Sequence, residues 1–391
     1  MSEVSSRRSI LIAANTAWYV YNFRKRFIED LIRTGYAVVV VSPRDEYSSR
    51  LGALGVNHIH LEIDNRVTNP FNDFIAIFKL LLILWKERPT VMLTFTPKLN
   101  IYGAIAGQIA SMPVVSNISG LGSGFIRGGW LSWFMKLLYR YALRSPRTVF
   151  FQNSDDRNLF IKHGLVSSER AKTLPGSGVD LHRFRPIERN RTCAYFVFLF
   201  VGRLLEDKGI REFVEAAKIT SGEFPTARFK VLGLRDSRNP TVISSDRLEE
   251  WKRSGLVEYL GATDDVIAYY ADADCVVLPS YREGCPRCLL EACSMEIPVI
   301  ATDVPGCRDV VRDGINGFIC RPRDSHDLAR QMQRMLKLSP FERKKMGIAG
   351  RSYMVQSFDE ATVIRRYFEA IEFITADNEN CRHRSGWFHR F

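Results

Sequence analysis

The stretch Leu278–Gly306 reads LPSYREGCPRCLLEACSMEIPVIATDVPG and contains a predicted strand, a loop and a predicted helix. A buried strand is predicted to end at Pro279, a loop then carries Glu283 and Gly284, and Pro286 stands where a helix would begin. The start of that helix presents free N–H groups and the positive end of its dipole. Since ligands of open α/β folds bind at the carboxyl edge of the sheet, this loop is a candidate site for a phosphate or a sugar hydroxyl.

Short β-branched runs alternate with longer helical patterns on both sides of this segment. The run SILIAAN begins the chain's first series, and YFVFLFVG begins a second series that contains Leu278–Gly306. Alternation of this kind is typical of βαβ units and parallel sheets. We therefore predict an α/β protein with two Rossmann-like, doubly wound domains that face each other across a cleft.

The predicted boundary lies in the segment 174–191, which is rich in Gly, Pro and charged residues. Residues 1–185 form the expected first domain and residues 186–356 the second, with GSGVD at 176–180 as the hinge. After Arg321 the sequence pattern predicts helices and no further strand. A helix at about 357–376 is expected to pack back on the first domain, and the end of the chain, 379–391, is expected to be frayed.

Composition limits the function classes. The 391 residues carry a formal charge of +12, which favours a polyanionic partner such as nucleic acid, an anionic membrane or a phosphorylated substrate. Eight irregularly spaced cysteines without a cleavable signal sequence indicate free thiols and a cytoplasmic protein.

The most apolar run of the chain is Phe74–Trp85. As a helix it would reach only about 18 Å, which is too short for a bilayer core of about 30 Å, so we interpret it as a buried domain helix.

A basic amphipathic segment follows in the first domain. WLSWFMKLLYRYALRSPR, at 130–147, interleaves aromatic residues with Lys136, Arg140, Arg144 and Arg147. Such a helix can lie on an anionic membrane, which would make the protein peripheral on the inner face of the cytoplasmic membrane. The competing interpretation is an ordinary amphipathic helix whose cations extend past its core face.

Two acids and two cations are the candidate functional side chains of the second domain. Glu283 and Glu291 can face one crevice and accept hydrogen bonds from hydroxyls. A glycosidase-like pair of carboxyl groups would lie about 5–9.5 Å apart, whereas an eight-residue helical offset gives roughly 12 Å, so we prefer the hydroxyl-binding role. In FVGRLLEDKG a strand delivers Gly202 and Arg203 to the sheet edge, and Lys208 follows at the next helix. Two fixed cations can stabilise the negative charge of a phosphate group without a metal. The competing interpretation is that the two acids, and likewise the two cations, are ordinary solvated surface residues.

Two further patterns invite a metal or redox role, and we reject both. Asp272 and Asp274 imitate a metal-binding Asp-x-Asp, yet they precede a strand and so lie at the wrong edge of the sheet. Cys285 and Cys288 have zinc or redox spacing, but no second pair accompanies them. Cys285 alone could be a reactive thiol because it is near a helix N-terminus. We expect no metal and no cofactor.

The segment 278–306 resembles the diagnostic signature of glycosyltransferase family four, whose two-domain fold is called GT-B. FVGRLLEDKGIREFVEAA and GSGVDLHRF are similar to the same family, so the resemblance covers most of the C-terminal half. It implies a retaining, metal-independent hexosyltransferase. By resemblance, Glu291 would bind the ribose hydroxyls, Glu283 the donor sugar, and Arg203 with Lys208 the diphosphate, within a donor pocket that also includes the following residues: Gly202, Gly284, Cys285 and Pro286.

The first domain carries weaker signals. The turn after its first strand lacks Gly-x-Gly-x-x-Gly, which argues against a dinucleotide dehydrogenase. Asn15 and the FRKRF that contains Arg24 resemble the subgroup that builds capsule, O-antigen and lipid-carried glycan intermediates. Gly120 and Gly122, in SNISGLGSGFIRGG, resemble that subgroup's acceptor-side loop, although a merely flexible connection explains these glycines equally well.

Together these features predict transfer of a hexose or N-acetylhexosamine from a nucleotide diphosphate sugar, with UDP as the expected nucleotide, to a glycan acceptor such as a lipid-diphosphate-linked saccharide. A sugar-nucleotide epimerase or a phosphorylase of similar fold is the rival enzyme. A basic nucleic-acid-binding protein is the rival from another class, and it is disfavoured because the cations are spread along the chain without a recognition motif.

Overall fold

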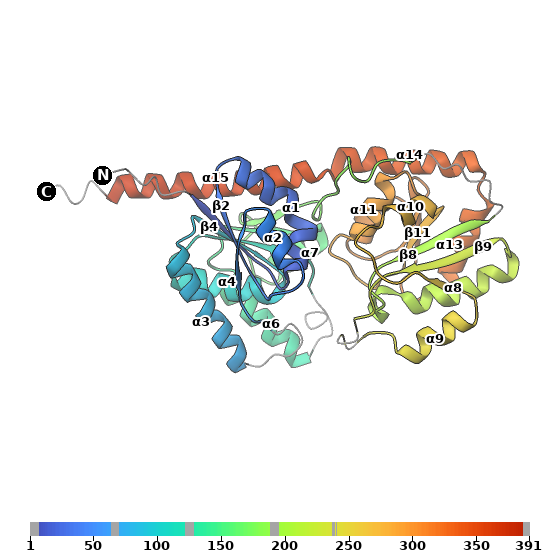
Figure 1. Cartoon of the computed structure of the whole chain (residues 1–391), viewed down its shortest axis with the longest axis horizontal. Coiled ribbons are helices and arrows are strands. Elements are labelled where there is room, and N and C mark those ends of the chain that lie inside the picture. The colour runs from blue at the N-terminus through green and yellow to red at the C-terminus, as the bar shows by residue number, and fades with distance from the viewer. Residues whose placement is uncertain are drawn as a thin grey trace. The chain divides into compact units, whose positions relative to one another are not determined.

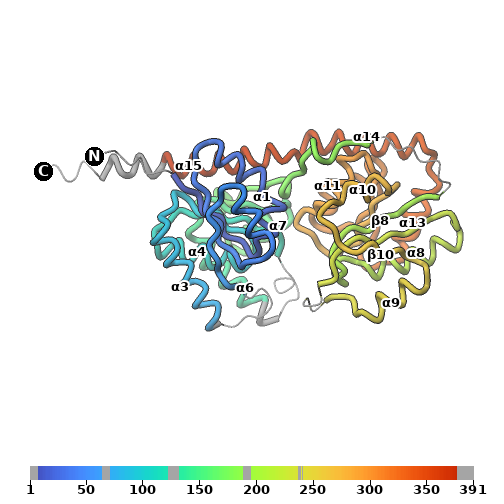
Figure 2. Tube along the Cα trace, in the orientation of Figure 1, coloured from blue at the N-terminus to red at the C-terminus, as the bar shows by residue number. Residues whose placement is uncertain are grey.

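The computed structural model describes residues 8–63, 70–121, 129–187, 195–236, 239 and 241–385. Contacts divide the chain into two compact units (Figures 1 and 2). The first unit consists of Met1–Leu174 with Ile364–Phe391, and the second is Pro175–Val363. Each unit has its own sheet and its own hydrophobic core.

The first unit is built on a seven-stranded parallel sheet in the order β3-β2-β1-β4-β5-β6-β7. Its strands are β1 (Ser9–Ala13), β2 (Ala37–Ser42), β3 (Asn57–His60), β4 (Val91–Phe95), β5 (Val114–Ile118), β6 (Thr148–Phe151) and β7 (Ala171–Thr173). Its helices are α1 (Ala17–Arg33), α2 (Ser48–Ala53), α3 (Pro70–Glu87), α4 (Pro97–Ile109), α6 (Gly129–Ala142), α7 (Ser154–Lys162) and most of α15 (Glu360–Ser385).

The second unit has a six-stranded parallel sheet in the order β10-β9-β8-β11-β12-β13. Its strands are β8 (Phe196–Val201), β9 (Ala227–Leu232), β10 (Glu258–Tyr259), β11 (Cys275–Leu278), β12 (Val299–Thr302) and β13 (Gly317–Cys320). Its helices are η1 (Glu206–Lys208), α8 (Ile210–Glu223), α9 (Ser245–Arg253), α10 (Ile267–Asp272), α11 (Arg287–Ser294), α12 (Cys307–Val310), α13 (Ser325–Lys337) and α14 (Pro340–Ser357).

Two parallel α/β sheets of this kind confirm the predicted fold class. The strands read as continuous apolar runs because helices cover both faces of a parallel sheet. The central strands β1, β4, β8 and β11 are accordingly buried almost throughout. Each sheet has one switch point, between β1 and β4 in the first unit and between β8 and β11 in the second, where neighbouring strands lead to helices in opposite directions.

The division by contacts falls after Leu174, so the predicted first boundary, after residue 185, lies inside the second unit. The reason is backbone pairing within that unit. The Val179 N–H donates to the Phe358 carbonyl at 2.9 Å, and the Glu360 N–H donates to the Val179 carbonyl at 3.2 Å. The residues after Leu174 are thereby fixed to the segment that joins α14 to α15.

Helix α15 packs within the first unit through Tyr367. The Tyr367 ring lies 5.1 Å from the Phe27 ring, 5.2 Å from Phe150 and 6.0 Å from Phe95, as measured between ring centroids. Aromatic pairs at such distances add to the burial of apolar surface. The helix continues to Ser385, so the prediction that residues 379–391 are frayed is wrong for 379–385, while 386–391 lie outside the described residues.

The prediction that Phe74–Trp85 is a buried helix is only half right. One side of α3 is buried through Ala76, Leu80 and Leu84, but Phe74 and Trp85 are exposed at 67% and 52%. Periodicity could not reveal this, because large apolar residues recur on the outer side of the helix as well as on the inner side. Among the described residues, no helix combines the length and apolarity needed to cross a membrane.

Candidate functional site

The candidate site of the second unit lies at the switch point between β8 and β11. The chain leaves β8 through Gly202 and Arg203 and leaves β11 through the loop that carries Glu283. Because β8 and β11 are parallel neighbours, both loops emerge at the same edge of the sheet. The structure therefore brings Lys208 and Glu283, 75 residues apart in the chain, into direct contact.

Lys208 and Glu283 form a half-buried ion pair. The Lys208 Nζ lies 2.5 Å from Glu283 Oε1, and the side chains are 21% and 11% exposed. Burial by itself would lower the pKa of Lys208, but the charge and hydrogen bond of Glu283 outweigh it and raise that pKa. Lys208 therefore stays cationic at neutral pH.

Arg203 lies close to this pair on the exposed side of the site. Its positive charge opposes the protonation of Lys208, which places the two cations within electrostatic reach of each other. In the part of the chain that the structure describes, no carboxylate forms an ion pair with the Arg203 guanidinium. The two loops thus bring together two cations and one acid, an excess of positive charge that is suited to an anionic ligand.

Backbone contacts fix the turn that carries Lys208 to the loop that carries Glu283. The Asp207 carbonyl accepts hydrogen bonds from the Tyr281 N–H at 2.9 Å and from the Ser280 hydroxyl at 3.0 Å. Gly209, with φ +72°, makes this approach possible, since a Cβ there would lie 2.0 Å from the Pro279 carbonyl oxygen. The ion pair therefore rests on a rigid frame.

Glu291 lies on α11 and has partners of its own. Its Oε2 accepts a hydrogen bond from the Tyr270 hydroxyl at 2.8 Å, and its Oε1 lies 3.0 Å from Arg287 Nε. The side chain is 12% exposed, and burial raises the pKa of its carboxyl, partly opposed by Arg287 and Tyr270. A carboxylate has about four acceptor positions, so two remain for ligand hydroxyls.

Comparison with known proteins identifies the family to which the chain belongs. Residues 195–338 match the family model "Glycosyl transferases group 1", and residues 23–176 match "Glycosyl transferase 4-like domain". This chain belongs to glycosyltransferase family four. The predicted family and the predicted class of enzyme are confirmed.

Two relatives of the glycosyltransferase are similar over much of their length. The chain is 26% identical over 367 residues, covering 90% of this chain and 94% of the other, to the N,N'-diacetylbacillosaminyl-diphospho-undecaprenol alpha-1,3-N-acetylgalactosaminyltransferase of Campylobacter jejuni. It is 28% identical over 268 residues, covering 64% and 67%, to the UDP-Gal:alpha-D-GlcNAc-diphosphoundecaprenol alpha-1,3-galactosyltransferase of Escherichia coli.

Solved structures agree on the GT-B fold. The glycosyltransferase superposes on Anabaena HepE in complex with UDP and glucose with a TM-score of 0.76 and 19% identity, covering 93% of this chain and 99% of the other. It superposes on sucrose-phosphate synthase of Thermosynechococcus elongatus with a TM-score of 0.78 and 19% identity, covering 95% and 100%.

Sequence reasoning missed several residues of the glycosyltransferase's candidate site. Arg287 could have been found from the sequence, since it stands four residues before Glu291 on the same helix and such residues face each other. Tyr270 could not have been found in this way, because it lies on another helix, 21 residues away from Glu291. Pro286 was expected at the first helical position and is the N-cap instead, so α11 begins at Arg287.

Cys285, Asp272 and Asp274, whose spacing suggested redox or metal chemistry, have contacts within the protein that point to structural roles. Burial raises the pKa of the Cys285 thiol, helped by the charges of Asp309 and Glu283, and this disfavours the thiolate that a reactive cysteine needs. Asp274 accepts a hydrogen bond from the Val197 N–H at 2.8 Å, and Asp272 pairs with Lys230 at 3.0 Å. No group of three or more His, Cys, Asp or Glu suited to a metal occurs among the described residues.

The acceptor-side residues predicted for the first unit lie in different surroundings. Asn15 is half-buried just after β1, and Gly120 follows β5. Arg24 is 2% exposed, with its guanidinium carbon 4.5 Å from the centre of the Phe95 ring. Its burial leaves little surface for an acceptor. Gly122 lies outside the described residues.

Thr96 is a first-unit residue that the sequence did not single out. It directly follows β4, across the switch point from Asn15, and has φ +73°, a conformation that costs a non-glycine residue about 1–3 kcal/mol. Its hydroxyl is buried and has no hydrogen-bond partner within the described parts of the chain. Strain and an unsatisfied hydroxyl at this edge are typical of a ligand-binding position.

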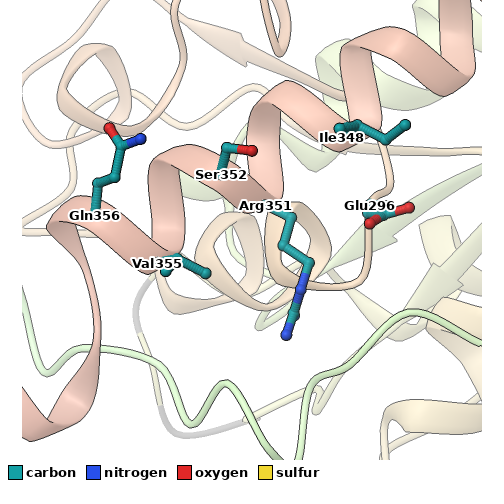
Figure 3. A pocket seen from close by; sticks show the side chains of 6 residues that line it. All are labelled: Glu296, Ile348, Arg351, Ser352, Val355 and Gln356. Carbon is teal, nitrogen blue, oxygen red and sulfur yellow. The ribbon is translucent and has the colours of Figure 1, made fainter.

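A separate cavity of about 330 Å³ lies along α14. Figure 3 shows Arg351 and four other lining side chains on α14, with Glu296 on a neighbouring loop. The Arg351 guanidinium donates to the backbone carbonyls of Phe184, Ser294 and Leu181. Since these bonds fix the segments around α14, this arginine has a structural role, and none of the predicted site residues lines the cavity.

We expect Gly306→Ala to impair the glycosyltransferase site without unfolding the protein. Gly306 has φ +80°, and an added Cβ would lie 2.6 Å from the Gly284 carbonyl oxygen and 2.7 Å from that of Glu283. The Glu283 loop would have to move, at a cost of about 1–3 kcal/mol of stability. Transfer kinetics with a thermal melt would measure both effects.

Gly314→Ala is the matched control for this variant. Gly314 has a similar φ of +74°, but an added Cβ would meet nothing within 4 Å. It therefore introduces the backbone strain without the collision. If both variants lost stability and transfer equally, displacement of the Glu283 loop would not be the cause.

Proposed function

We propose that this glycosyltransferase moves a hexose or N-acetylhexosamine from a UDP-sugar to a lipid-diphosphate-linked saccharide with retention of the anomeric configuration. The observation that carries the proposal is the ion pair of Lys208 and Glu283 at the switch point, with Arg203 within electrostatic reach. Glu291 lies on α11, the helix that follows the Glu283 loop, and Cys288 is close enough to feel the charges of Lys208, Glu283 and Glu291. The nature of the two substrates is supported by the names of the relatives, which include UDP-galactose and saccharides on diphosphoundecaprenol.

Each side chain has a role in this proposal. Arg203 and Lys208 bind the diphosphate of the donor and stabilise the charge that develops on it as the bond to the sugar breaks. Glu291 accepts hydrogen bonds from the ribose hydroxyls, while Tyr270 and Arg287 hold its carboxylate in position. Glu283 positions Lys208 through Oε1 and has its second oxygen available for a sugar hydroxyl.

The retaining outcome is what the family resemblance implies. In this proposal the acceptor hydroxyl attacks from the face that the phosphate leaves, and a phosphate oxygen of the donor takes the acceptor's proton. A protein base is then unnecessary. The cations act on the phosphate as its charge grows, so they lower the barrier rather than merely tightening binding.

A transfer assay tests the proposal. UDP-galactose, UDP-glucose and their N-acetylated counterparts would each be offered with and without a synthetic saccharide on a lipid diphosphate. We expect one donor to give a lengthened lipid-linked product with an α-linkage by NMR. Product formed without acceptor would instead favour an epimerase or a hydrolase, and a β-linked product would contradict retention.

A further inference from the structure

Helices α3 and α6 expose large apolar side chains on the first unit. Both helices pack against α4, and they lie near each other in Figure 1. The exposed residues are Phe71, Phe74, Phe78, Leu82 and Trp85 on α3, with Trp133, Phe134, Leu137 and Tyr141 on α6. Their exposed fractions run from 41% to 71%. Exposed apolar surface of this extent marks a place of interaction rather than ordinary surface.

The exposed residues of α3 form one continuous stripe. They recur every three or four positions, which places them on one side of the helix. The opposite side, with Ala76, Leu80 and Leu84, faces the core. A helix that is apolar on both sides is normally covered on both sides. The outer stripe of α3 therefore indicates an apolar environment that is not part of the described chain.

A basic cavity lies at the C-terminal end of α6. It has a volume of about 310 Å³, the lower end of the range of roughly 300–1,000 Å³ for ligand pockets. Arg140, Arg144 and Arg170 line it together with Ser167, and no Asp or Glu is among its lining residues. In the described parts of the chain, no carboxylate pairs with these three guanidinium groups.

Arg170 is held in place at this cavity. Its Nη1 donates to the Arg144 carbonyl at 2.6 Å, and its Nε donates to the Ser167 hydroxyl at 3.1 Å. These bonds fix the plane of the guanidinium and leave Nη2 for a ligand. A planar guanidinium group held in a fixed orientation beside two further arginines is suited to binding the oxygens of a phosphate group.

The cavity is remote from the edge at which doubly wound sheets bind their substrates. Arg144 precedes β6 and Arg170 precedes β7, so both lie at the amino edge of the sheet. Asn15 and Thr96 follow β1 and β4 and lie at the carboxyl edge. Helix α6 connects the two edges, with Trp133 and Phe134 toward its start and Arg140 at its end.

We propose that the cavity binds the phosphate headgroup of an anionic phospholipid while the exposed side chains of α3 and α6 enter the bilayer interface. Aromatic residues beside cations are the combination by which interfacial helices bind anionic membranes. Leu137 and Tyr141 lie within one turn of Arg140, so one membrane surface can contact both kinds of group. The inference goes beyond the proposed function, since it assigns a site at the amino edge of the first unit's sheet, and none of the residues of the proposed reaction lines that cavity.

The alternative is that Arg140 and Arg144 only stabilise the negative end of the α6 dipole. That role needs neither the cavity nor the apolar side chains beside it. It also predicts that their loss lowers the stability of the protein, whereas a lipid site predicts a loss of membrane binding in a protein of unchanged stability. The two roles are therefore separable by experiment.

Vesicle flotation with the full chain tests the proposal. We expect the protein to float with vesicles of phosphatidylcholine and phosphatidylglycerol but not with phosphatidylcholine alone. Arg140→Gln/Arg144→Gln should weaken binding about 10–30-fold, because each cation near an anionic surface contributes about 1 kcal/mol. Lys344→Gln/Lys345→Gln, which removes two exposed cations from α14, is the control with the same change in net charge and should float like the wild type.

Other outcomes would overturn the proposal. Equal losses in both double variants would mean that only overall charge matters. Absence of flotation, together with calorimetric binding of inorganic phosphate that Arg140→Gln/Arg144→Gln abolishes, would identify a free phosphate as the ligand. Self-association of the wild type in place of flotation would assign the apolar surface to a second copy of the chain.

A second variant tests the apolar part independently of charge. Phe74→Ser/Phe78→Ser replaces two exposed side chains of the α3 stripe, so the core should not change. We expect at least about a tenfold loss of flotation, since burying an aromatic side chain contributes about 1.5–3 kcal/mol. Transfer to a detergent-dispersed acceptor should persist in both this variant and Arg140→Gln/Arg144→Gln, so a failure of the membrane site can be told from a failure of the proposed reaction.

Discussion

Lys208→Ala should reduce kcat for sugar transfer about 10²–10³-fold, the usual effect of removing one group that stabilises charge in the transition state. The KM for the donor should change much less. The structure supports this expectation because Lys208 stays protonated beside Glu283 and lies at the switch point with Arg203. Steady-state kinetics with the preferred donor would measure the effect.

The controls separate catalysis from folding. Removing Lys208 leaves Glu283, which is 11% exposed, without its partner, and an unpaired buried charge destabilises a protein. Lys208→Ala/Glu283→Gln should therefore regain stability without regaining kcat. Lys218→Ala, at an exposed position on α8, should match the wild type. A Lys208→Ala enzyme with normal kcat would contradict the proposed role.

Glu291→Ala should raise the Kd for UDP about 10–100-fold, because a hydrogen bond to a charged group contributes about 1.5–3 kcal/mol. Isothermal calorimetry would measure it. The loss should appear in binding, with a smaller effect on kcat at saturating donor, since ribose hydroxyls are far from the bond that breaks. Equal affinity of wild type and variant would remove Glu291 from the nucleotide site.

The pH dependence of donor binding provides a second readout for Glu291. Burial raises the pKa of its carboxyl above the ordinary value. Since ribose hydroxyls donate to the ionised form, the affinity for a UDP-sugar should fall as the pH is lowered through that raised pKa. Glu291→Gln keeps an acceptor for the Tyr270 hydroxyl but does not titrate there, so its affinity should be lower at pH 7 and nearly independent of pH.

Tyr270→Phe tests whether Tyr270 positions Glu291. It removes only the hydroxyl that donates to Glu291 Oε2. We expect a weaker affinity for UDP together with a shift of the pH profile to higher pH, because the tyrosine hydrogen bond favours the ionised carboxylate. Tyr269→Phe, on the neighbouring position of α10, is the matched control. A purely structural role for Tyr270 would alter stability but leave the pH profile in place.

The amino-acid sequence alone predicted the two parallel sheets and the order of their elements. Alternating strand and helix patterns depend on neighbours a few residues apart, so a chain read alone contains that information. It also determined that Gly202, Arg203 and the Glu283 loop follow strands, and hence that they lie at a carboxyl edge. The family signature, which is local too, gave the enzyme class.

The contacts of the individual side chains could be learned only from the three-dimensional fold. Tyr270 reaches Glu291 from another helix, Arg24 turns into an aromatic interior, and Val179 pairs with the segment near Phe358. Contacts between distant segments leave no periodic trace in a single sequence. For the same reason the outer stripe of α3 looked like a core face: composition shows that a surface is apolar, but whether anything covers it depends on how the rest of the chain packs.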